Sequence, residues 1–476
     1  MPRTIVALAV AAGVALAAAP AHAGIDPAAG APYNIDVFFG PVFGSTRIIG
    51  LGGAYTAIAE GAEGILYNPA AVANRYRYSL RWFDYDVGFD YYFFLLGDKT
   101  DFDNNRLTRY ENFRQFMFFL APALHFGPFS VSVAWIRQSF SRPMTPLLAA
   151  TNLSLDLVHA SIGYRFFEGA FVVGIGGRFE SLSSRNATLA DLGGTTRPEL
   201  GVLWRPASLP VRVGLAFRSK ATACPPDYRT TEGCRPTATA GLQTVVMPWE
   251  LEVGVALSFG PRVFNRPWKN PRVRRAARIA EVNAARATRR EELHALLNTT
   301  PPADRARVAR DWEAKDKLIR DDEDRLVEAW GEHIKDHDDA RLRAEDRIHT
   351  VVSADLLVSG AVDDALGIEA AVTNAALDAS GTPIDPTRDT KIAWSPRLGV
   401  ESEVWYDRLK LRSGAYLEPA RYALTKPRLH GTVGAELRLL YFTPPILLPR
   451  TGIRAGVTGD FAAHYINLSV SIGIWH

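Results

Sequence analysis

Apolar residues alternate with polar or small residues over most of the chain. The pattern is clear in residues 129–135, 211–218 and 250–259, where every second residue is large and apolar or nearly so. Successive side chains of a β-strand point to opposite faces of the sheet, so each segment has one apolar and one polar face. This period of two predicts strands rather than helices.

The alternating segments predict about fourteen strands. The short connections between them, at 127–128, 168–169, 206–210 and 407–408, fall on alternate junctions. In an outer-membrane barrel whose two ends lie in the periplasm, the strand number is even and the short turns face the periplasm. The expected strands are residues 77–96, 113–126, 129–142, 152–167, 170–183, 195–205, 210–219, 248–260, 351–362, 391–406, 408–419, 428–441, 449–458 and 464–475.

A soluble β-sandwich also alternates, so two folds compete. The polar faces here mix charged residues with Gly, Ser and Ala, aromatic residues lie near segment ends, and the segments are long enough to cross a bilayer at a tilt. The last segment ends in Trp475-His476, which resembles the C-terminal assembly signal of outer-membrane barrels except for the final His. We therefore predict an all-β protein, a transmembrane antiparallel β-barrel of about 14 strands with a polar lumen.

The N-terminus has the form of an export signal. Arg3 precedes an apolar run at residues 5–19, and Ala21-His22-Ala23 fits a signal-peptidase site, which predicts a mature start at Gly24. No other stretch is long and apolar enough to span a bilayer as a helix. The chain is thus expected to leave the cytoplasm.

Composition narrows the class of protein further. Of 476 residues, 54 are Lys or Arg and 51 are Asp or Glu, and the resulting net charge of +3 gives no reason to expect a nucleic-acid partner. The hydrophobic fraction of 47% excludes a disordered chain. Two cysteines cannot form a disulfide framework, but Cys224 and Cys234 are expected to form one disulfide in an oxidising compartment.

Residues 263–350 break the alternation and are dense in charge. They are rich in Ala, Arg, Glu and Leu, which predicts two helices, at about 271–297 and 303–348, folded as a hairpin on the periplasmic side. Gly331 is a candidate break in the second helix. His333 and His337 lie one turn apart and are a weak candidate metal site. A solvated helix face is the favoured interpretation of these histidines, and for residues 271–348 a partner-binding arm is favoured over a metal site.

A motif rich in glycine and small residues lies between the export signal and the first strand. It runs from Gly50-Leu51-Gly52-Gly53 to Tyr67-Asn68-Pro69-Ala70. It does not follow a strand in a nucleotide-binding unit, so a phosphate-binding loop is rejected. Asn68 can bond to its own backbone and begin a turn, and Pro69 cannot continue a ladder.

This motif resembles the N-terminal signature of the FadL-like outer-membrane transporters, whose relatives include barrels that shuttle secreted proteins. The resemblance implies a location in the outer membrane and a hatch that plugs the lumen. It also implies passive uptake of long-chain fatty acids or other hydrophobic compounds, with lateral exit into the membrane. The predicted parts are a signal peptide (1–23), a hatch (24–75), strands one to eight (76–262), the hairpin insertion (263–350) and strands nine to fourteen (351–476).

Candidate ligand contacts follow from the alternation. Lumen-facing arginines can bind a substrate carboxylate through paired hydrogen bonds, or they can pair with lumen-facing acids and stiffen the wall, which is the favoured interpretation. Aromatic hatch residues can line a route for a hydrophobic ligand. No enzyme is expected: His125 and His159 lie in strands near Ser132 and Ser161, without a nucleophile motif. Expected partners are outer-membrane lipid, a hydrophobic small molecule and a periplasmic protein, with no cofactor. The candidate lumen residues are Arg178, Arg212, Arg397, Arg412, Phe38, Phe39 and Phe43.

Overall fold

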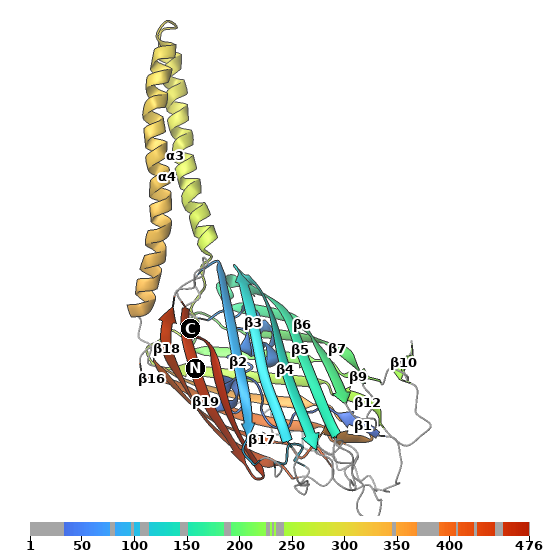
Figure 1. Ribbon diagram of the computed structural model, residues 1–476. Helices are drawn as coiled ribbons and strands as arrows, with labels where there is room; N and C mark the ends of the chain where they lie inside the picture. Colours follow the sequence, from blue (N-terminus) through green and yellow to red (C-terminus); the bar gives the residue numbers. More distant parts are fainter. Residues whose placement is uncertain are drawn as a thin grey trace, which may run out of the picture.

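The chain forms a closed β-barrel of fourteen strands with a long helical hairpin at one end (Figure 1). This computed structural model describes residues 33–76, 81–96, 100–104, 114–142, 151–184, 192–224, 229–230, 233–234, 242–344, 349–368, 390–405, 408–422, 426–442 and 451–475. The predicted signal peptide lies outside the described residues. The predicted fold class and strand number are confirmed.

Every barrel strand pairs antiparallel with its sequence neighbour, and β2 closes the barrel against β20. The first strand begins at Phe83 rather than at residue 77, and the other bounds agree with the predicted ones to within a few residues. The barrel strands are β2 (Phe83–Phe94), β3 (Arg114–Phe126), β4 (Phe129–Arg142), β5 (Thr151–Phe166), β6 (Phe171–Ser184), β7 (Leu192–Trp204), β8 (Val211–Arg218), β13 (Glu250–Phe259), β14 (Thr350–Ser359), β16 (Ala393–Trp405), β17 (Leu409–Glu418), β18 (Arg428–Phe442), β19 (Thr451–Ala462) and β20 (Tyr465–Trp475).

The outer face of the barrel is apolar. Outward side chains at mid-strand, such as Val133, Ile162 and Leu398, are about half exposed, and aromatic side chains such as Phe129, Trp204 and Trp394 stand near strand ends. An apolar band between aromatic girdles is the surface of a barrel that spans the outer membrane. Among the described residues, no helix is long and apolar enough to cross a bilayer.

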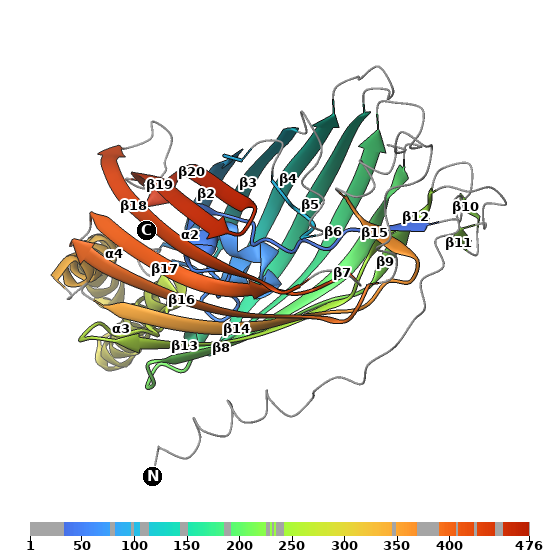
Figure 2. The same ribbon diagram turned by 90° about the horizontal axis from the view of Figure 1, so that it is seen from below.

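The N-terminal segment lies inside the barrel. It contains β1 (Tyr33–Asp36), α2 (Thr46–Gly50) and two 3-10 helices, η1 (Glu63–Leu66) and η2 (Pro69–Ala73). Figure 2 shows this segment, in blue, enclosed by the strands. Its side chains are almost all buried, and they form a large part of the core. We call residues 33–76 the hatch.

Strands outside the barrel extend the hatch at one end. β1 pairs in parallel with β12 (Leu242–Met247) and β15 (Ala365–Gly367), and β12 also pairs with β9 (Ala221–Ala223). A separate small hairpin joins β10 (Arg229–Thr230) and β11 (Gly233–Cys234). Cys224 is disulfide-bonded, and Cys234 is the other cysteine of the chain.

The hairpin leaves β13 and returns to β14, at the end of the barrel that has the short turns (Figure 1), one of which contains a 3-10 turn, η4 (Phe167–Gly169). Short turns face the periplasm in such barrels, so we call this the periplasmic end. Its helices are α3 (Pro271–Thr299) and α4 (Arg305–Ala344). The expectation of a break at Gly331 is wrong, because α4 continues through it. One glycine costs a helix only about 1 kcal/mol.

The two helices have opposite net charge. α3 has seven arginines and three glutamates, or 7 − 3 = +4, and α4 has ten basic and twelve acidic residues, or 10 − 12 = −2. Arg286 and Arg289 both pair with Glu323 of α4, at 2.8 and 2.7 Å. Ion pairs therefore hold together a hairpin that has few buried apolar side chains. Its longer arm is about 60 Å long.

Candidate functional site: the hatch and the two faces of the lumen

Asn68, in the predicted hatch motif, connects three parts of the lumen. Its side-chain oxygen caps η2 by accepting from the Ala70 amide at 3.0 Å. Its side-chain nitrogen donates to the carbonyl of Thr56 within the hatch and to that of Val202 in β7, both at 3.1 Å. An amide side chain can serve as donor and acceptor at once, which explains why Asn suits this position.

The motif glycines allow close approach between hatch and wall. Gly52 and Gly53 have φ of +59° and +73°, in the left-handed region that glycine tolerates. A Cβ on Gly52 would also lie 2.9 Å from the Ala415 amide nitrogen of β17, and one on Gly50 would lie 3.2 Å from the Arg412 Cβ. The hatch therefore packs backbone against backbone here.

Polar side chains of the wall bind the hatch through its backbone. Asp90 accepts from the Thr46 amide at 2.7 Å, and Asp355 accepts from the Thr56 amide at 2.6 Å. Arg218 donates to the carbonyl of Tyr67 at 2.8 Å. A short irregular segment leaves many backbone groups unpaired, and these wall groups satisfy them. Sequence reasoning missed this role because alternation shows which side chains point inward but not what they meet.

The four candidate arginines point into the lumen, as predicted, and each is paired with acids or hatch atoms. Arg178 pairs with Glu199 at 2.9 Å. Arg397 pairs with Glu252 at 2.8 Å. Arg412 lies between Glu401 and Glu436, at 2.6 and 3.1 Å, with its side chain fully buried. These contacts fit the wall-stiffening interpretation better than a free carboxylate site.

Arg212, the fourth, meets the hatch instead of a wall acid. It donates to Asn265 at 2.8 Å, and one of its nitrogens lies 3.8 Å from Glu60 of the hatch. Glu60 also pairs with Arg47 at 2.6 Å. Burial alone raises the pKa of Glu60, but the charges of Arg47 and Arg212 outweigh burial and hold its pKa below the usual value.

The lumen is not polar all round, and this corrects the sequence-based expectation. In the parts of β3, β4 and β5 that lie away from the hairpin, the inward side chains are mainly apolar and buried, like many of the outward ones. The signal was present in the nearly continuous apolar run of residues 116–126, because a strand that is apolar on both faces loses its alternation. We call the following residues the apolar lumen face: Met117, Phe119, Ala121, Ala123, Ala134, Ile136, Phe140, Leu155 and Leu157.

A phenylalanine cluster lies at the extracellular end of this face. The rings of Phe39 and Phe43 are 4.5 Å apart, and Phe102 contacts Phe39 at 6.2 Å and Phe140 of β4 at 5.7 Å. Two of the three candidate hatch phenylalanines thus meet there. The third, Phe38, lies apart under the guanidinium of Arg421, 4.7 Å from its ring centre.

One amide is buried within the apolar lumen face. Gln138 of β4 is fully buried, and it lies opposite Met117 and Leu155 in the neighbouring strands. Neither its side-chain nitrogen nor its oxygen has a hydrogen-bond partner among the described residues. A buried polar group without a partner costs about 1–3 kcal/mol, so the position needs an explanation.

Backbone pairing between β3 and β4 is interrupted beside the small residues of the apolar lumen face. β3 and β4 pair up to Leu120–Trp135 and again from Ala123–Ser132, but Ala121 and Pro122 have no backbone pair with β4, where the Ser132 hydroxyl donates to the Pro122 carbonyl at 2.8 Å instead. Proline has no amide hydrogen to donate. On the outside, an apolar groove lined by Pro122, Val133 and Ile162, among others, runs over β3 to β7. The two residues without a backbone pair therefore lie between the apolar lumen face and an apolar outer groove.

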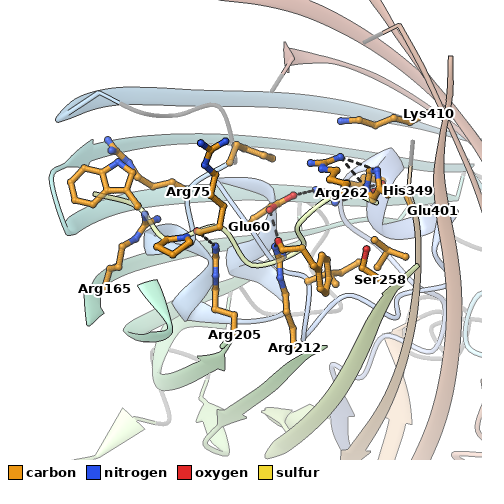
Figure 3. Close-up of a pocket in the computed structure, with 18 residues that line it drawn as sticks. Glu60, Arg75, Arg165, Arg205, Arg212, Ser258, Arg262, His349, Glu401 and Lys410 are labelled. Carbon is orange, nitrogen blue, oxygen red and sulfur yellow. Dashed lines mark hydrogen bonds and ion pairs between the residues drawn. The ribbon is translucent and has the colours of Figure 1, made fainter. Parts of the chain in front are cut away.

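A chamber lined by arginines lies at the periplasmic end (Figure 3). Its walls come from the end of the hatch, the ends of barrel strands and both roots of the hairpin. In Figure 3, Arg75, Arg165 and Arg205 gather at one end and Arg262, His349 and Lys410 at the other, with Glu60 between them. We call this the arginine chamber. Its basic residues are Arg47, Arg75, Arg165, Arg205, Arg212, Arg262, Arg266 and Lys410.

The candidate metal-binding and catalytic histidines of the sequence do not form a metal site or an active site among the described residues. His333 is exposed on α4, the side chain of His337 lies outside the described residues, and the described residues contain no cluster of three metal-ligating groups. His125 and His159 face the lumen and not the outer wall. His125 bonds to Ser130 at 2.8 Å, and His159 lies 3.5 Å from Glu199.

No family model and no curated protein matches the sequence. Solved structures similar to the chain include a Pseudomonas aeruginosa FadL homologue, at 9% identity and a TM-score of 0.46, over 92% of this chain and 99% of that one. The P. putida toluene transporter TodX is similar at 11% identity and a TM-score of 0.46, over 92% and 99%. The Ralstonia pickettii toluene transporter TbuX is similar at 12% identity and 0.43, over 91% and 98%.

Proposed function

We propose that this barrel takes up hydrophobic compounds passively across the outer membrane, as a member of the FadL-like transporters. The observation that supports this most is the apolar lumen face, which runs from the phenylalanine cluster to the interruption in the pairing of β3 with β4. A water-filled pore would not need it, and the hatch fills the route that a solute would take through the lumen.

The proposed route follows the apolar lumen face. A ligand leaves water at Phe39, Phe43 and Phe102, passes Phe119 and Phe140, and reaches the small residues Ala121 and Ala134. It then crosses the wall at Pro122 into the outer groove and the membrane. Burial of apolar surface, worth about 25 cal/mol per Å², favours each step from water to lipid, so no energy source is needed.

The buried amide of Gln138 suggests the ligand's chemistry. It can donate to and accept from a polar end group while the rest of the ligand lies against Met117 and Leu155. A long-chain fatty acid, alcohol or related amphiphile has this form. A plain aromatic hydrocarbon, such as the toluene named for two of the similar proteins, would leave the amide without a partner.

A reversible cross-link across the interruption tests the route. Ala121→Cys and Ala134→Cys together place two thiols on facing lumen positions, by the register on either side of the break. Oxidation is expected to close the gap and reduce palmitate uptake by proteoliposomes to the background rate, and dithiothreitol is expected to restore it. Wild-type protein receives the same treatments, because its own disulfide also responds to them.

Transport at the wild-type rate by the fully oxidised double variant, with the cross-link verified by mass spectrometry, would contradict lateral exit. A matched control is Leu124→Cys with Val133→Cys, two outward positions beside the same gap. Failure of wild-type protein to raise palmitate or toluene entry above empty liposomes would contradict uptake altogether.

A second proposal concerns the hairpin, which the transport route does not use. We propose that it docks a periplasmic protein. The supporting observation is a set of large apolar side chains that stand exposed on the described part of α3 and α4, including Val273, Leu318 and Leu326, each more than half exposed. A helical arm that projects about 60 Å from the barrel can present them to a partner.

Removal of residues 271–344, with a short Gly-Ser link in their place, separates the two proposals. Uptake of palmitate is expected to stay at the wild-type rate. Cross-linking in intact cells is expected to lose a protein that the full chain captures, and Leu318→Glu with Leu326→Glu should lose the same protein. Capture that persists in both variants would contradict docking on the hairpin.

A further inference from the structure

The arginine chamber has eight Arg and Lys side chains and two carboxylates, and two of its arginines, Arg75 and Arg165, are part of the positive surplus. Arg75 is 3% exposed and Arg165 is 6% exposed. No carboxylate of the described residues lies within 4 Å of either guanidinium. The two chamber acids are already engaged: Glu60 with Arg47 and Arg212, and Glu401 with Arg47 and Arg412.

Carbonyl groups, rather than carboxylates, hold these two arginines in place. Arg165 donates twice to the Ala73 carbonyl, at 3.1 and 2.6 Å. Arg75 donates to the Trp82 carbonyl at 3.3 Å, and its Nε has no hydrogen-bond partner among the described residues. Burial lowers the pKa of Arg75 to about 10, so its charge persists at neutral pH. Backbone carbonyls thus fix both guanidinium groups, and the charge of Arg75 is offset only at longer range, by Asp84.

An aromatic ring brings these charges together. The guanidinium of Arg75 lies 5.2 Å from the ring centre of Trp268, and that of Arg165 lies 5.4 Å from it. Arg205 contributes from the end of β7 and donates to the Arg266 carbonyl at 3.0 Å. Guanidinium groups from the hatch, the wall and the hairpin root thus face one chamber (Figure 3).

We propose that the arginine chamber binds a phosphate group, either free phosphate or the headgroup of a phospholipid. A guanidinium fork matches the oxygens of phosphate, and a tetrahedral phosphate group can be reached from more directions than a planar carboxylate. The chamber lies at the periplasmic end, where phospholipid headgroups of the inner leaflet are within reach. Bound phosphate would connect the hatch end to the hairpin root through Arg75, Arg165 and Arg266.

Calorimetric titration of the full-length mature protein in detergent and chloride buffer tests this. Sodium phosphate is expected to bind the wild-type protein and to bind Arg75→Gln about tenfold more weakly, through loss of one charged donor group. Arg75→Lys keeps the charge and should recover part of the affinity. Arg307→Gln, on an exposed pair near the hairpin tip, should bind like the wild type.

Short-chain phosphatidylglycerol, titrated in the same way, separates the two sources. Binding of phosphate alone assigns the site to the free anion, and binding of both assigns it to a headgroup. Heat-modifiable gel mobility verifies that each variant is folded, and Arg165→Gln replaces Arg75→Gln if that variant does not fold. No binding of either probe to wild-type protein, or equal binding by the folded variant, would overturn the proposal. The outcome does not depend on hydrophobic uptake, which is measured separately.

Discussion

The two sides of the lumen are built on opposite principles although the same barrel provides both. On β3 to β5 the apolar lumen face presents phenylalanine, leucine and alanine, with the amide of Gln138 among them. On β16 to β19 about half of the inward side chains are charged, and many of them form ion pairs, such as Arg412 with Glu401 and Glu436. The charged side binds the wall and the hatch to each other, and the apolar side leaves few polar groups that would oppose a hydrophobic ligand.

This difference has an energetic consequence. Each charge buried on the charged side must keep a partner of opposite charge, because an unpaired buried charge costs several kcal/mol. Contacts on the apolar side are non-directional, so a ligand can replace them with contacts of its own. A barrel with both sides charged would fix its hatch in place but would exclude a hydrophobic ligand. A barrel with both sides apolar would lack the bonds that fix a small irregular plug.

The largest effect is expected from Arg412→Ala on the charged side. The substitution removes a fully buried guanidinium from between two carboxylates. Glu401 retains Arg47 at 2.9 Å, and Glu436 retains Arg454 at 2.8 Å. The expected loss is therefore about 3 kcal/mol, at the low end for a broken buried pair. Urea unfolding of detergent-solubilised protein, followed by gel mobility, measures it.

Arg307→Ala is the matched control, because its pair with Asp304 is exposed and should leave the urea midpoint unchanged. A midpoint for Arg412→Ala equal to that of the wild type would mean that the charged side does not stabilise the barrel.

Much of this architecture could be predicted from sequence, for a definite reason. A period of two maps directly onto the two faces of a strand, so the fourteen strands and the inward direction of Arg178, Arg212, Arg397 and Arg412 follow from local pattern. The hairpin follows in the same way from composition and its central break at residues 298–302.

What the sequence could not give depends on contacts between distant residues. Arg218 bonds to the Tyr67 carbonyl across 151 positions, and Asp355 to the Thr56 amide across 299. No local pattern encodes which hatch atom a wall residue meets. The apolar lumen face was overlooked because a polar lumen was assumed for every strand. The arginine chamber is lined by residues from at least five separate segments, and no spacing of arginines in the sequence predicts that they meet.

Asn68→Ala is expected to have the next largest effect, and it tests the attachment of the hatch. It leaves two carbonyls and one amide without their partner, and because the bond to Val202 is only partly buried we expect a total cost of about 2 kcal/mol. The hatch should loosen from β7, and the ion conductance of single barrels in planar bilayers should rise. Asn283→Ala, exposed on α3, is the control, and conductance equal to it would count against a fixed plug.

Gln138→Leu distinguishes ligands with a polar end group from plain hydrocarbons on the apolar side. It removes an amide without a partner, so the urea midpoint should stay the same or rise. Uptake of palmitate should fall by about fivefold, which corresponds to one hydrogen bond of about 1 kcal/mol, and uptake of toluene should not fall. Equal losses for both compounds would mean that the amide has no part in recognition of a polar end group.

The smallest effect is expected at the hairpin, where pairs are partly exposed. Hydrogen bonds from Arg289, and from Arg286, hold the pKa of Glu323 below its usual value. A carboxyl whose pKa is lowered in the folded state stabilises that state above its unfolded pKa, and the contribution is lost as pH falls through the lowered one. Solvent limits this contribution to less than about 1 kcal/mol.

The helical circular dichroism signal of the full chain, which comes mainly from α3 and α4, should therefore be lost at a lower temperature when the pH is below the usual range of glutamate pKa values. Glu323→Gln should show that lower value already at neutral pH and should change less on acidification. An equal acid shift in both proteins would mean that other carboxylates hold the hairpin.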